Sequence, residues 1–422
     1  MSEWKEEILK DVVIKISDRD HFTPTYVEVG IPMISPKDIK ENERIDFSNC
    51  KYITEEAHQK NRKKTDLKTD DLVFTRIGAL LGKICIVENW MPEFSILHSA
   101  AMIRANKSVI KPEYLMYFIK SHYFQSQIKN EIQSIGVPDL GLDKINKFKI
   151  KYPTDKKKQH KIALVLLSCD KLIEQTQSAI AKYKAIKQGM LHDLFTRGLD
   201  ASGKLRPTYQ QAPELYKESE LGMIPKEWEV KRLEECCNEH CSYGINAGSV
   251  DFDSKLPLYL RITDITEDGK YNRSSKKCVN DPQSDNYILK ENDIVFARTG
   301  ATVGKTYLYD PNDGKLIYAG FLIKVSPNKN KLNSYFLKSY TETSIYWNWV
   351  NVFSQRSGQP GINGNEFGSL GLSIPHISEQ NEIAKRFQSI DNKLKSEETL
   401  LSKYQSIKRG LMGDLLNGKK GV

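Results

Sequence analysis

The chain has 422 residues, too many for one ordinary hydrophobic core, so we expect two or three domains. Lys and Arg outnumber Asp and Glu by 63 to 54, and the net charge of +9 is compatible with a polyanionic partner without requiring one. Segment 1–13 lacks the basic start and apolar core of a secretory signal, and no apolar run approaches the length of a membrane span. We therefore expect a soluble, cytoplasmic protein with no membrane partner.

The first 155 residues are predicted to form a globular domain. Short β-rich runs such as 71–77 (DLVFTRI) alternate with Gly, Pro and Asn, and stretches such as 112–124 (PEYLMYFIKSHYF) are amphipathic at helical spacing. This mixture is typical of an α+β domain, which we place at 1–155.

Residues 156–197 are different in kind and are predicted to form one long helix. Their stripe alternates spacings of four and three, with Lys187 as the interruption, and consists of Ile162, Leu166, Cys169, Ile173, Thr176, Ile180, Tyr183, Met190 and Leu194. Segment 378–422 carries a similar stripe, formed by Ile383, Phe387, Ile390, Leu394, Glu397, Leu401, Tyr404, Lys408, Leu411 and Leu415. From 160 to 194 the first helix would be about 50 Å long at 1.5 Å per residue.

Each of these two stripes needs a partner. Two helices of one chain can bury their stripes against each other, and a two-fold relation between the halves of the chain makes that pair antiparallel, as in a coiled coil. The alternative is that each helix packs on its own domain as an ordinary amphipathic surface helix.

The segment between the first helix and the next domain, 198–222, is rich in Gly, Pro and polar residues. We interpret it as a linker that travels back along the helix pair. A second α+β domain is predicted at 223–377.

The second half of the chain repeats the first. Residues 71–83 read DLVFTRIGALLGK and residues 293–305 read DIVFARTGATVGK, with a constant offset of 222 positions. The correspondence continues at 182–195 against 403–416, now with an offset of 221. The chain is therefore a duplicated unit, which predicts a pseudo-two-fold internal repeat.

The repeated stretch looks at first like a phosphate-binding loop, because Gly300 precedes Gly304, Lys305 and Thr306. A Walker A loop needs four residues between its first glycine and the Gly-Lys pair, so that backbone N–H groups can wrap the phosphates. Only three residues stand here, and the first copy also lacks the hydroxyl of Thr306. An ATPase is therefore not favoured.

The cysteines number seven and do not form a disulfide framework, which favours a reducing compartment. One cluster contains Cys236, Cys237, His240 and Cys241. Adjacent cysteines match zinc-site spacing poorly and no second pair follows, so we interpret the cluster as packing and expect no bound metal.

The predicted architecture suits a target with two separated parts, and duplex DNA, which dimeric proteins read as half-sites, is the obvious one. The entry to the second domain reads LGMIPKEWEV (221–230), and the junctions into the helices read YPTDKKKQHKIA (152–163) and IPHISEQNEIA (374–384). With these motifs in order, essentially the whole chain resembles the specificity (S) subunit of type I restriction-modification systems.

This resemblance implies two target-recognition domains, each reading one half of a bipartite, asymmetric DNA sequence. It implies that the antiparallel pair of long spacer helices sets the length of the unread spacer and docks the methyltransferase subunits. The implied partners are two adenine methyltransferase (modification) subunits that use S-adenosylmethionine, and restriction subunits that use ATP and Mg²⁺ to translocate and cut DNA. No catalysis and no bound cofactor are implied for this chain itself.

The absence of catalysis agrees with the motifs, because the sequence contains no adenine-methyltransferase tetrad, Gly-rich cofactor loop or hydrolase signature. Scattered acidic and basic residues could still compose a nuclease site in three dimensions. The alternatives are therefore a self-contained endonuclease or NTPase, and the same DNA reader in a methylation-only complex.

The repeated turn supplies the first candidate DNA contacts. Arg76 and Lys83 bracket a turn of small residues in the first copy, as Arg298 and Lys305 do in the second, where Thr299 lies beside them. Such a turn lets the backbone approach a phosphate, and Arg and Lys bind phosphate or guanine. Because both copies share the pair but should read different sequences, we interpret it as a contact to the DNA backbone. The alternative is that the glycines only shape a β-hairpin.

Base recognition is expected where the two copies diverge. The candidates are loop side chains that can pair with base edges, namely Arg19, His21 and Gln133 in the first copy and Tyr243, Asn246, Gln355, Arg356 and Gln359 in the second. Val137 stands where the second copy has Gln359, which weakens the case that this loop contacts bases in both domains. The alternative for each residue is a solvated loop position.

Overall fold

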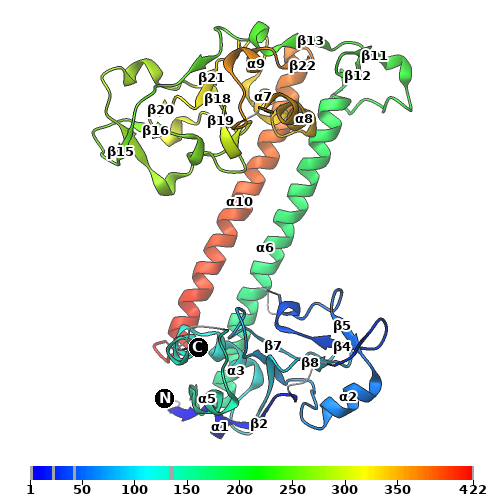
Figure 1. The fold of residues 1–422 in the computed structure, drawn as a ribbon, viewed down its shortest axis with the longest axis vertical. Helices are drawn as coiled ribbons and strands as arrows, with labels where there is room; N and C mark the ends of the chain where they lie inside the picture. Colours follow the sequence, from blue (N-terminus) through cyan, green and yellow to red (C-terminus); the bar gives the residue numbers. More distant parts are fainter. Residues whose placement is uncertain (1–2, 21–23, 41–43, 133–136, 357, 421–422) are drawn as a thin grey trace. The chain divides into compact units, whose positions relative to one another are not determined.

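The structure is a computed structural model that describes residues 3–20, 24–40, 44–132, 137–356 and 358–420 (Figure 1). The chain forms two compact units, unit 1 (Met1–Ala179 with Glu397–Val422) and unit 2 (Ile180–Ser396). Within the described residues, no helix is long and apolar enough to cross a membrane.

Unit 1 contains two four-stranded sheets and one strand pair. The pair is antiparallel, β1 (Trp4–Ile8) with β10 (Lys149–Pro153). The first sheet is antiparallel, in the order β2 (Val13–Ser17), β9 (Ala100–Ala105), β6 (Leu72–Thr75), β7 (Ile84–Ile86). The second has the order β3 (Tyr26–Val27), β5 (Lys51–Ile53), β4 (Ile31–Ile34), β8 (Ser95–Ile96), and its β4–β8 pairing is parallel.

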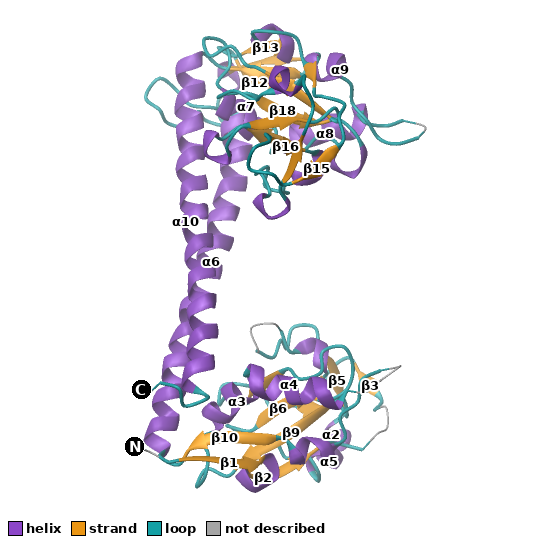
Figure 2. Ribbon diagram, turned by 90° about the vertical axis from the view of Figure 1, so that its left-hand side faces the viewer, coloured by secondary structure: helices purple, strands orange, loops and turns teal. Residues whose placement is uncertain are grey.

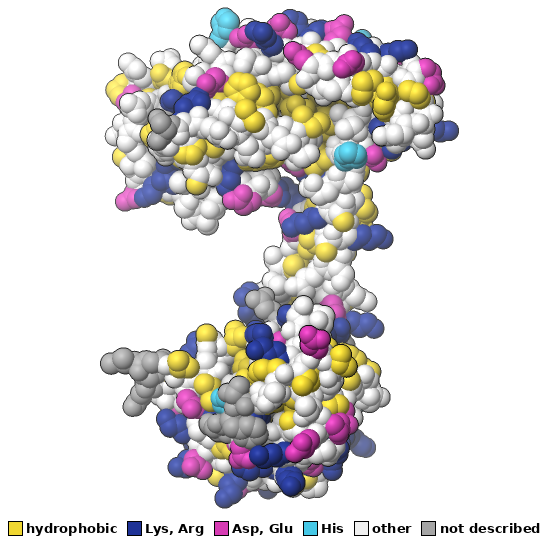
Figure 3. All heavy atoms as spheres, turned by 45° about the vertical axis from the view of Figure 1, so that its right-hand side comes forward, with side chains coloured by type: hydrophobic (Ala, Val, Ile, Leu, Met, Phe, Trp, Pro, Cys, Tyr) yellow, Lys and Arg dark blue, Asp and Glu magenta, His cyan; other side chains and the backbone are white. Residues whose placement is uncertain are grey.

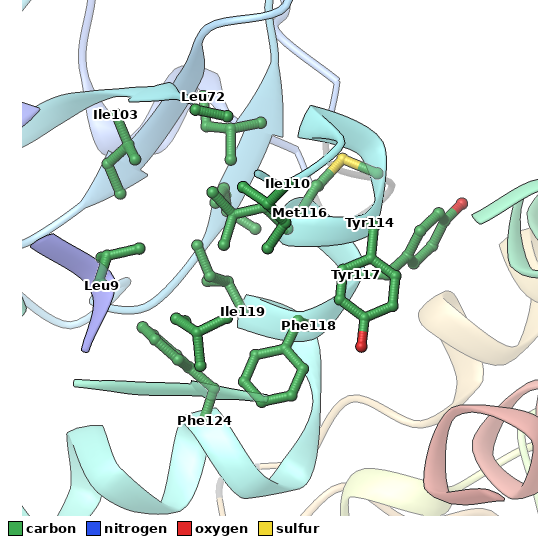
Figure 4. Packing of buried hydrophobic residues seen from close by; sticks show 14 of the residues in the cluster. Leu9, Leu72, Ile103, Ile110, Tyr114, Met116, Tyr117, Phe118, Ile119 and Phe124 are labelled. Atoms are coloured by element: carbon green, nitrogen blue, oxygen red, sulfur yellow. The ribbon is translucent and has the colours of Figure 1, made fainter. Parts of the chain in front are cut away.

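The helices of unit 1 cover one face of the first sheet (Figure 2). They are α1 (Leu9–Val12), α3 (Pro112–Lys120), α4 (His122–Glu131) and α5 (Leu142–Lys147), and α3 and α4 lie over β6 and β9. Helix α2 (Glu55–Arg62) packs instead beside β8 of the second sheet, where the His58 ring is hydrogen-bonded to Ser95 at 2.9 Å. Proline occupies the first position of α3, and the Ser121 hydroxyl caps α4 by accepting the Phe124 N–H. Figure 4 shows Phe118, Ile119 and Phe124 of these helices in the core that also contains Leu9.

Strand β6 is buried on both faces, which makes its sheet the middle layer of unit 1. Leu72 and Phe74 join the core under α3 and α4, whereas Val73 joins the core that includes the second sheet. Alternate residues of a strand face opposite sides, so a continuous apolar run is what this position requires.

Unit 2 repeats this topology. Its antiparallel pair is β13 (Glu229–Arg232) with β22 (Gly371–Ile374). Its sheets have the orders β14 (Ser242–Tyr243), β21 (Leu322–Val325), β18 (Ile294–Ala297), β19 (Thr306–Leu308) and β15 (Ser249–Asp251), β17 (Lys277–Val279), β16 (Leu258–Leu260), β20 (Leu316–Tyr318). The β16–β20 pairing is parallel, as β4–β8 is in unit 1. The predicted internal repeat of two α+β domains is thus confirmed.

The helices of unit 2 that correspond to α3, α4 and α5 are α7 (Ser334–Tyr340), α8 (Ser344–Phe353) and α9 (Gly364–Gly368). Short 3₁₀ helices complete the chain: η1 (Pro36–Asp38) in unit 1, and η2 (Pro213–Leu215), η3 (Leu233–Cys236), η4 (Ile262–Asp264), η5 (Arg273–Ser275), η6 (Ser284–Tyr287), η7 (Gly300–Thr302) and η8 (Pro311–Asp313) in unit 2.

Two long helices, α6 (Lys156–Thr196) and α10 (Ile377–Leu415), each contribute one part to each unit. In unit 1, Ile162 and Leu166 of α6 share a core with Leu415 of α10. In unit 2, Leu194 of α6 shares a core with Phe387 of α10. Within either unit the early part of one helix lies beside the late part of the other, as expected for an antiparallel pair.

All residues of the two predicted stripes, including the interruption at Lys187, are buried or half-buried. The predicted alternative is also partly correct, because the helices pack on the domains as well. The Tyr117 hydroxyl of α3 donates to Asp170 of α6 at 2.7 Å, and the Tyr335 hydroxyl of α7 donates to Asp391 of α10 at 2.7 Å.

The predicted course of segment 198–222 is wrong. The segment stays in unit 2 and does not travel back along the helices, because α6 already ends in the unit that the next domain joins. Arg206 pairs with Glu379 of α10 at 2.7 Å, and the Leu199 N–H donates to the same carboxylate at 2.7 Å. The segment then forms a hairpin of β11 (Tyr216–Ser219) and β12 (Gly222–Pro225).

Candidate nucleic-acid interface

The repeated Gly-rich stretch is a hairpin turn in both units. It joins β6 to β7 in unit 1 and β18 to β19 in unit 2, and both pairs are antiparallel. The Gly82 and Gly304 N–H groups donate to Thr75 and Ala297 at 2.9 Å, and both glycines have left-handed φ, 89° and 86°. The hairpin role of the glycines is therefore confirmed. A Walker A loop leads from a strand into a helix, so this geometry also argues against phosphate binding of that kind.

Each turn is held against a second loop from the same unit. In unit 1 the Gly78 N–H donates to the Pro138 carbonyl at 2.9 Å, and in unit 2 the Gly300 N–H donates to the Pro360 carbonyl at 3.0 Å. The structure thus brings together two segments that the sequence suggested separately, the shared turn and the divergent loop that contains Gln359. The pairing was not predictable, because backbone bridges across 60 residues leave no periodic signal.

Tyr243 of β14 completes a small polar surface in unit 2. The Arg298 guanidinium lies 4.8 Å from the centroid of the Tyr243 ring, within cation–π range. The Tyr243 hydroxyl accepts the Gly364 N–H at 2.9 Å, which fixes the ring. Gln359 is exposed, and its amide reaches toward Gly300, where an added Cβ would lie 2.9 Å from Nε2. We call Tyr243, Arg298, Thr299 and Gln359 the unit 2 turn surface.

Two other candidates of unit 2 are exposed, Asn246 and Gln355. Arg356 is exposed too, but one nitrogen of its guanidinium donates to both carboxylate oxygens of Glu366, at 2.5 and 2.7 Å. Arg356 therefore stabilises the start of α9, and the glutamines are the better base-reading candidates here.

The candidate arginines of unit 1 are enclosed. Arg19 is 1% exposed, donates from Nε to the Asp20 carbonyl at 3.1 Å, and has a pKa lowered by burial. Arg76 is 4% exposed and pairs with Asp18 at 2.8 Å and Asp139 at 2.6 Å. Neither side chain presents its guanidinium to a ligand in this conformation. His21 and Gln133 lie outside the described residues.

The two shared lysines differ in their partners. Lys83 donates to the Ile39 carbonyl at 3.3 Å, whereas Lys305 forms an ion pair with Glu267. Lys and Arg side chains on the face in Figure 3 are interspersed with Asp and Glu. The distribution of charge on this face therefore does not by itself locate an interface.

The cysteine cluster has no metal-binding geometry. Throughout the described part of the chain, no three His, Cys, Asp or Glu side chains are grouped so that they could hold a metal ion. Burial raises the pKa of Cys237 to about 12 and that of Cys241 to about 11. Burial therefore favours the neutral thiol over the thiolate at both positions.

Segments 1–182 and 225–404 match the family model of the type I restriction modification DNA specificity domain. The chain belongs to this family. Each matched specificity-domain segment contains one turn, with Arg76 in the first and Arg298 in the second.

Relatives of full length are found among curated specificity subunits. The chain is 25% identical over 426 residues to the putative type I restriction enzyme MjaX specificity subunit of Methanocaldococcus jannaschii, covering 99% of this chain and 93% of that protein. It is 24% identical to the MjaVIII specificity subunit of the same organism, covering 85% of this chain and 80% of that protein.

The fold is also found in solved specificity-subunit structures. The S subunit of the type I system of M. genitalium superposes with a TM-score of 0.63 at 14% identity, covering 98% of this chain and 96% of that chain. A chain from a study of assembly of the type I restriction-modification system gives a TM-score of 0.55 at 15% identity, covering 98% and 97%.

Proposed function

We propose that this chain is the non-catalytic DNA-specificity subunit of a type I restriction-modification complex, and that units 1 and 2 each read one half of a bipartite duplex site. The observation that carries the proposal is the repetition of one topology with different side chains at the same turn. In unit 2 that position offers Tyr243 and Gln359, and in unit 1 it offers carboxylates. Two readers of one fold with different surfaces suit an asymmetric target.

The proposed partners besides duplex DNA are two adenine methyltransferase subunits, docked on α6 and α10, and restriction subunits. S-adenosylmethionine, ATP and Mg²⁺ would then be bound by those subunits. Exposed leucines on α6 support a protein contact there, since Leu164, Leu167 and Leu172 are 46%, 54% and 42% exposed. The complex would act on chromosomal DNA in the cytoplasm.

Mapping of methylated adenines in the host genome tests this function. We expect one bipartite motif with two different halves, which disappears when the gene for this chain is deleted. Exchange of residues 223–377 for those of another family member should change one half of the motif and leave the other intact. A change in both halves, or in neither, would contradict the assignment of one half-site to each unit.

Purification with the chain's own partner subunits separates the remaining possibilities. ATP-dependent cleavage that requires restriction subunits supports the full complex, and methylation without such subunits indicates a methylation-only complex. DNA cleavage by the isolated chain would overturn its non-catalytic role.

A further inference from the structure

The two turns carry the same Arg and Lys, but the residues around the arginine differ between the two units. Ser17 pairs with Met102 and Ser242 pairs with Lys324, which are equivalent positions of the two sheets, so the following residues Asp18 and Tyr243 correspond. Isolated bridges join Ile77 to Asp139 and Thr299 to Gly361, so Asp139 and Gly361 correspond as well. Both carboxylates beside the unit 1 arginine are therefore absent from unit 2.

Arg76 is consequently a structural residue. Its Nη groups lie 2.8 Å from Asp18 and 2.6 Å from Asp139, and Nη1 also donates to the Leu140 carbonyl at 3.1 Å. Two carboxylates against one guanidinium leave this site without positive charge for a phosphate. Arg76 instead ties the turn to the loop that follows Pro138.

Arg298 has the same backbone position and a different charge balance. It rests on the Tyr243 ring, and its Nε is buried without a hydrogen-bond partner. Within the described residues no carboxylate pairs with Arg298. A half-buried guanidinium on an aromatic ring, with its charge uncompensated, is suited to bind an acceptor outside the chain.

The lysines show the opposite arrangement. Lys305, in unit 2, is neutralised by Glu267. Lys83, in unit 1, donates only to the neutral Ile39 carbonyl at 3.3 Å, and the described residues give it no acidic partner. Among the described residues, each unit thus keeps one cation of the Arg and Lys pair without an acidic partner, but the two units keep it at different positions.

We infer that the DNA-binding cation of the shared turn is Lys83 in unit 1 and Arg298 in unit 2, and that Arg76 and Lys305 serve the protein itself. This division of roles rests on the proposed DNA-reading function. It goes beyond that function, because the aligned sequences alone would assign the same role to Arg76 and Arg298. The acceptor on DNA is a phosphate oxygen or the edge of a guanine, both of which bind guanidinium and ammonium groups.

The test is a salt titration of DNA binding. The full chain, co-purified with its modification subunits, is titrated with a fluorescent duplex carrying the motif found by methylation mapping. Each phosphate contact contributes about 0.9 to the slope of log affinity against log salt concentration. For phosphate contacts we expect K83A and R298A each to reduce the slope by about 0.9, and K305A and R76A to leave it near the wild-type value. Equal slopes for the equivalent variants of each pair, together with unchanged discrimination between cognate and mismatched duplexes, would overturn the inference.

The two possible acceptors on DNA, a phosphate oxygen and a guanine edge, predict different effects of R298A on DNA binding. A phosphate contact of Arg298 predicts equal weakening of binding to cognate and mismatched duplexes, whereas a guanine contact predicts that weakening depends on one base pair of the unit 2 half-site. For a guanine contact the salt slope of R298A stays near the wild-type value, and the base-pair-dependent weakening is then the result that assigns Arg298 to DNA.

R76A is destabilised by two unpaired carboxylates, so a second experiment transfers the unit 1 carboxylate to unit 2. Y243D places a carboxylate at the position of Asp18, and Y243N is the uncharged control of the same shape. We expect Y243D to reduce the salt slope by about 0.9 relative to Y243N, as removal of Arg298 does. Identical slopes together with identical discrimination between cognate and mismatched duplexes would refute the role of Arg298. Failure of the wild-type complex to bind its duplex specifically would instead refute the proposed function.

Discussion

Replacement of Lys187 by methionine tests the ion-pair network between α6 and α10 in unit 2. Lys187 Nζ lies 2.6 Å from Glu342 and 2.7 Å from Asp391, and 14% of its side chain is exposed. Asp391 also accepts the Tyr335 hydroxyl at 2.7 Å, and Glu342 also pairs with Lys338 at 3.0 Å. The lysine is thus the shared cation of two half-buried carboxylates.

The expected cost follows from the partners that remain. Removal of one partner from a buried ion pair costs about 3–5 kcal/mol, because a charge is left uncompensated. Lys338 and Tyr335 offset part of this, so we expect the free energy of unfolding of unit 2 to fall by about 2–3 kcal/mol. Methionine retains most of the side-chain volume, so lost packing contributes little.

The effect of K187M should depend on pH. Burial acts to raise the pKa of Glu342, but Lys338 and Lys187 outweigh it and the pKa is lowered. A carboxyl group whose pKa is lower in the folded state than in the unfolded state stabilises the fold at pH values above its unfolded-state pKa. This stabilisation is lost as the pH falls through the folded-state pKa. In K187M this loss should begin at higher pH. For Lys187 burial acts to lower the pKa, but Glu342 and Asp391 raise it overall, so its contribution disappears as pH rises through the folded pKa.

Urea unfolding followed by circular dichroism, with hydrogen exchange to assign each transition to a unit, measures the change. The matched control is K408M, because Lys408 pairs with Asp170 at 2.5 Å at the equivalent place in unit 1. K187M should destabilise unit 2 and K408M unit 1. A change below about 0.5 kcal/mol in K187M, the range of ordinary surface substitutions, would refute the reasoning.

Three further predictions concern the turn, the connecting segment and the thiols. In G304A the new Cβ is placed on backbone with a φ of 86° and lies 2.7 Å from a valine methyl of α8. Thermal unfolding should therefore show that unit 2 is destabilised by about 1–3 kcal/mol, and G358A is the control variant that should be unaffected. R206A leaves the half-buried Glu379 without its cation, so limited proteolysis should cut 198–225 faster than in wild type; equal rates would contradict this. Cys237, whose pKa burial raises to about 12, should react slowly with iodoacetamide near neutral pH, and rapid alkylation would refute this.

The sequence predicted the fold where its signals were periodic or repeated. The spacing of four and three located both long helices, and every predicted stripe position is buried or half-buried. The duplicated run at 71–83 and 293–305 predicted two domains of one topology. Lys187, the apparent fault in the stripe, lies at the interface because Asp391 and Glu342 neutralise it.

Long-range polar pairings were beyond sequence reasoning. Arg76 and Arg298 look identical in the repeat, and only the positions of Asp18 and Asp139 in space distinguish them. The prediction for the course of 198–222 is wrong for a related reason, since the contact of Arg206 with Glu379 spans 173 residues. An alignment of Ser17 with Ser242 would have shown that Tyr243 stands where the first copy has Asp18. This difference is the signal in the sequence that could have distinguished the two arginines.

The division of the long helices between the units sets an order of assembly. Unit 2 is one uninterrupted stretch, Ile180–Ser396, whereas unit 1 needs Glu397–Val422 as well as the early residues. Leu415 and Leu416 are part of the unit 1 core, and Lys151 binds the Asn417 carbonyl at 3.2 Å. During synthesis on a ribosome, unit 1 therefore cannot complete its core until segment 397–422 has been made, whereas unit 2 can finish folding before that. A nonsense mutation near residue 400 should thus damage the reader that was translated earliest.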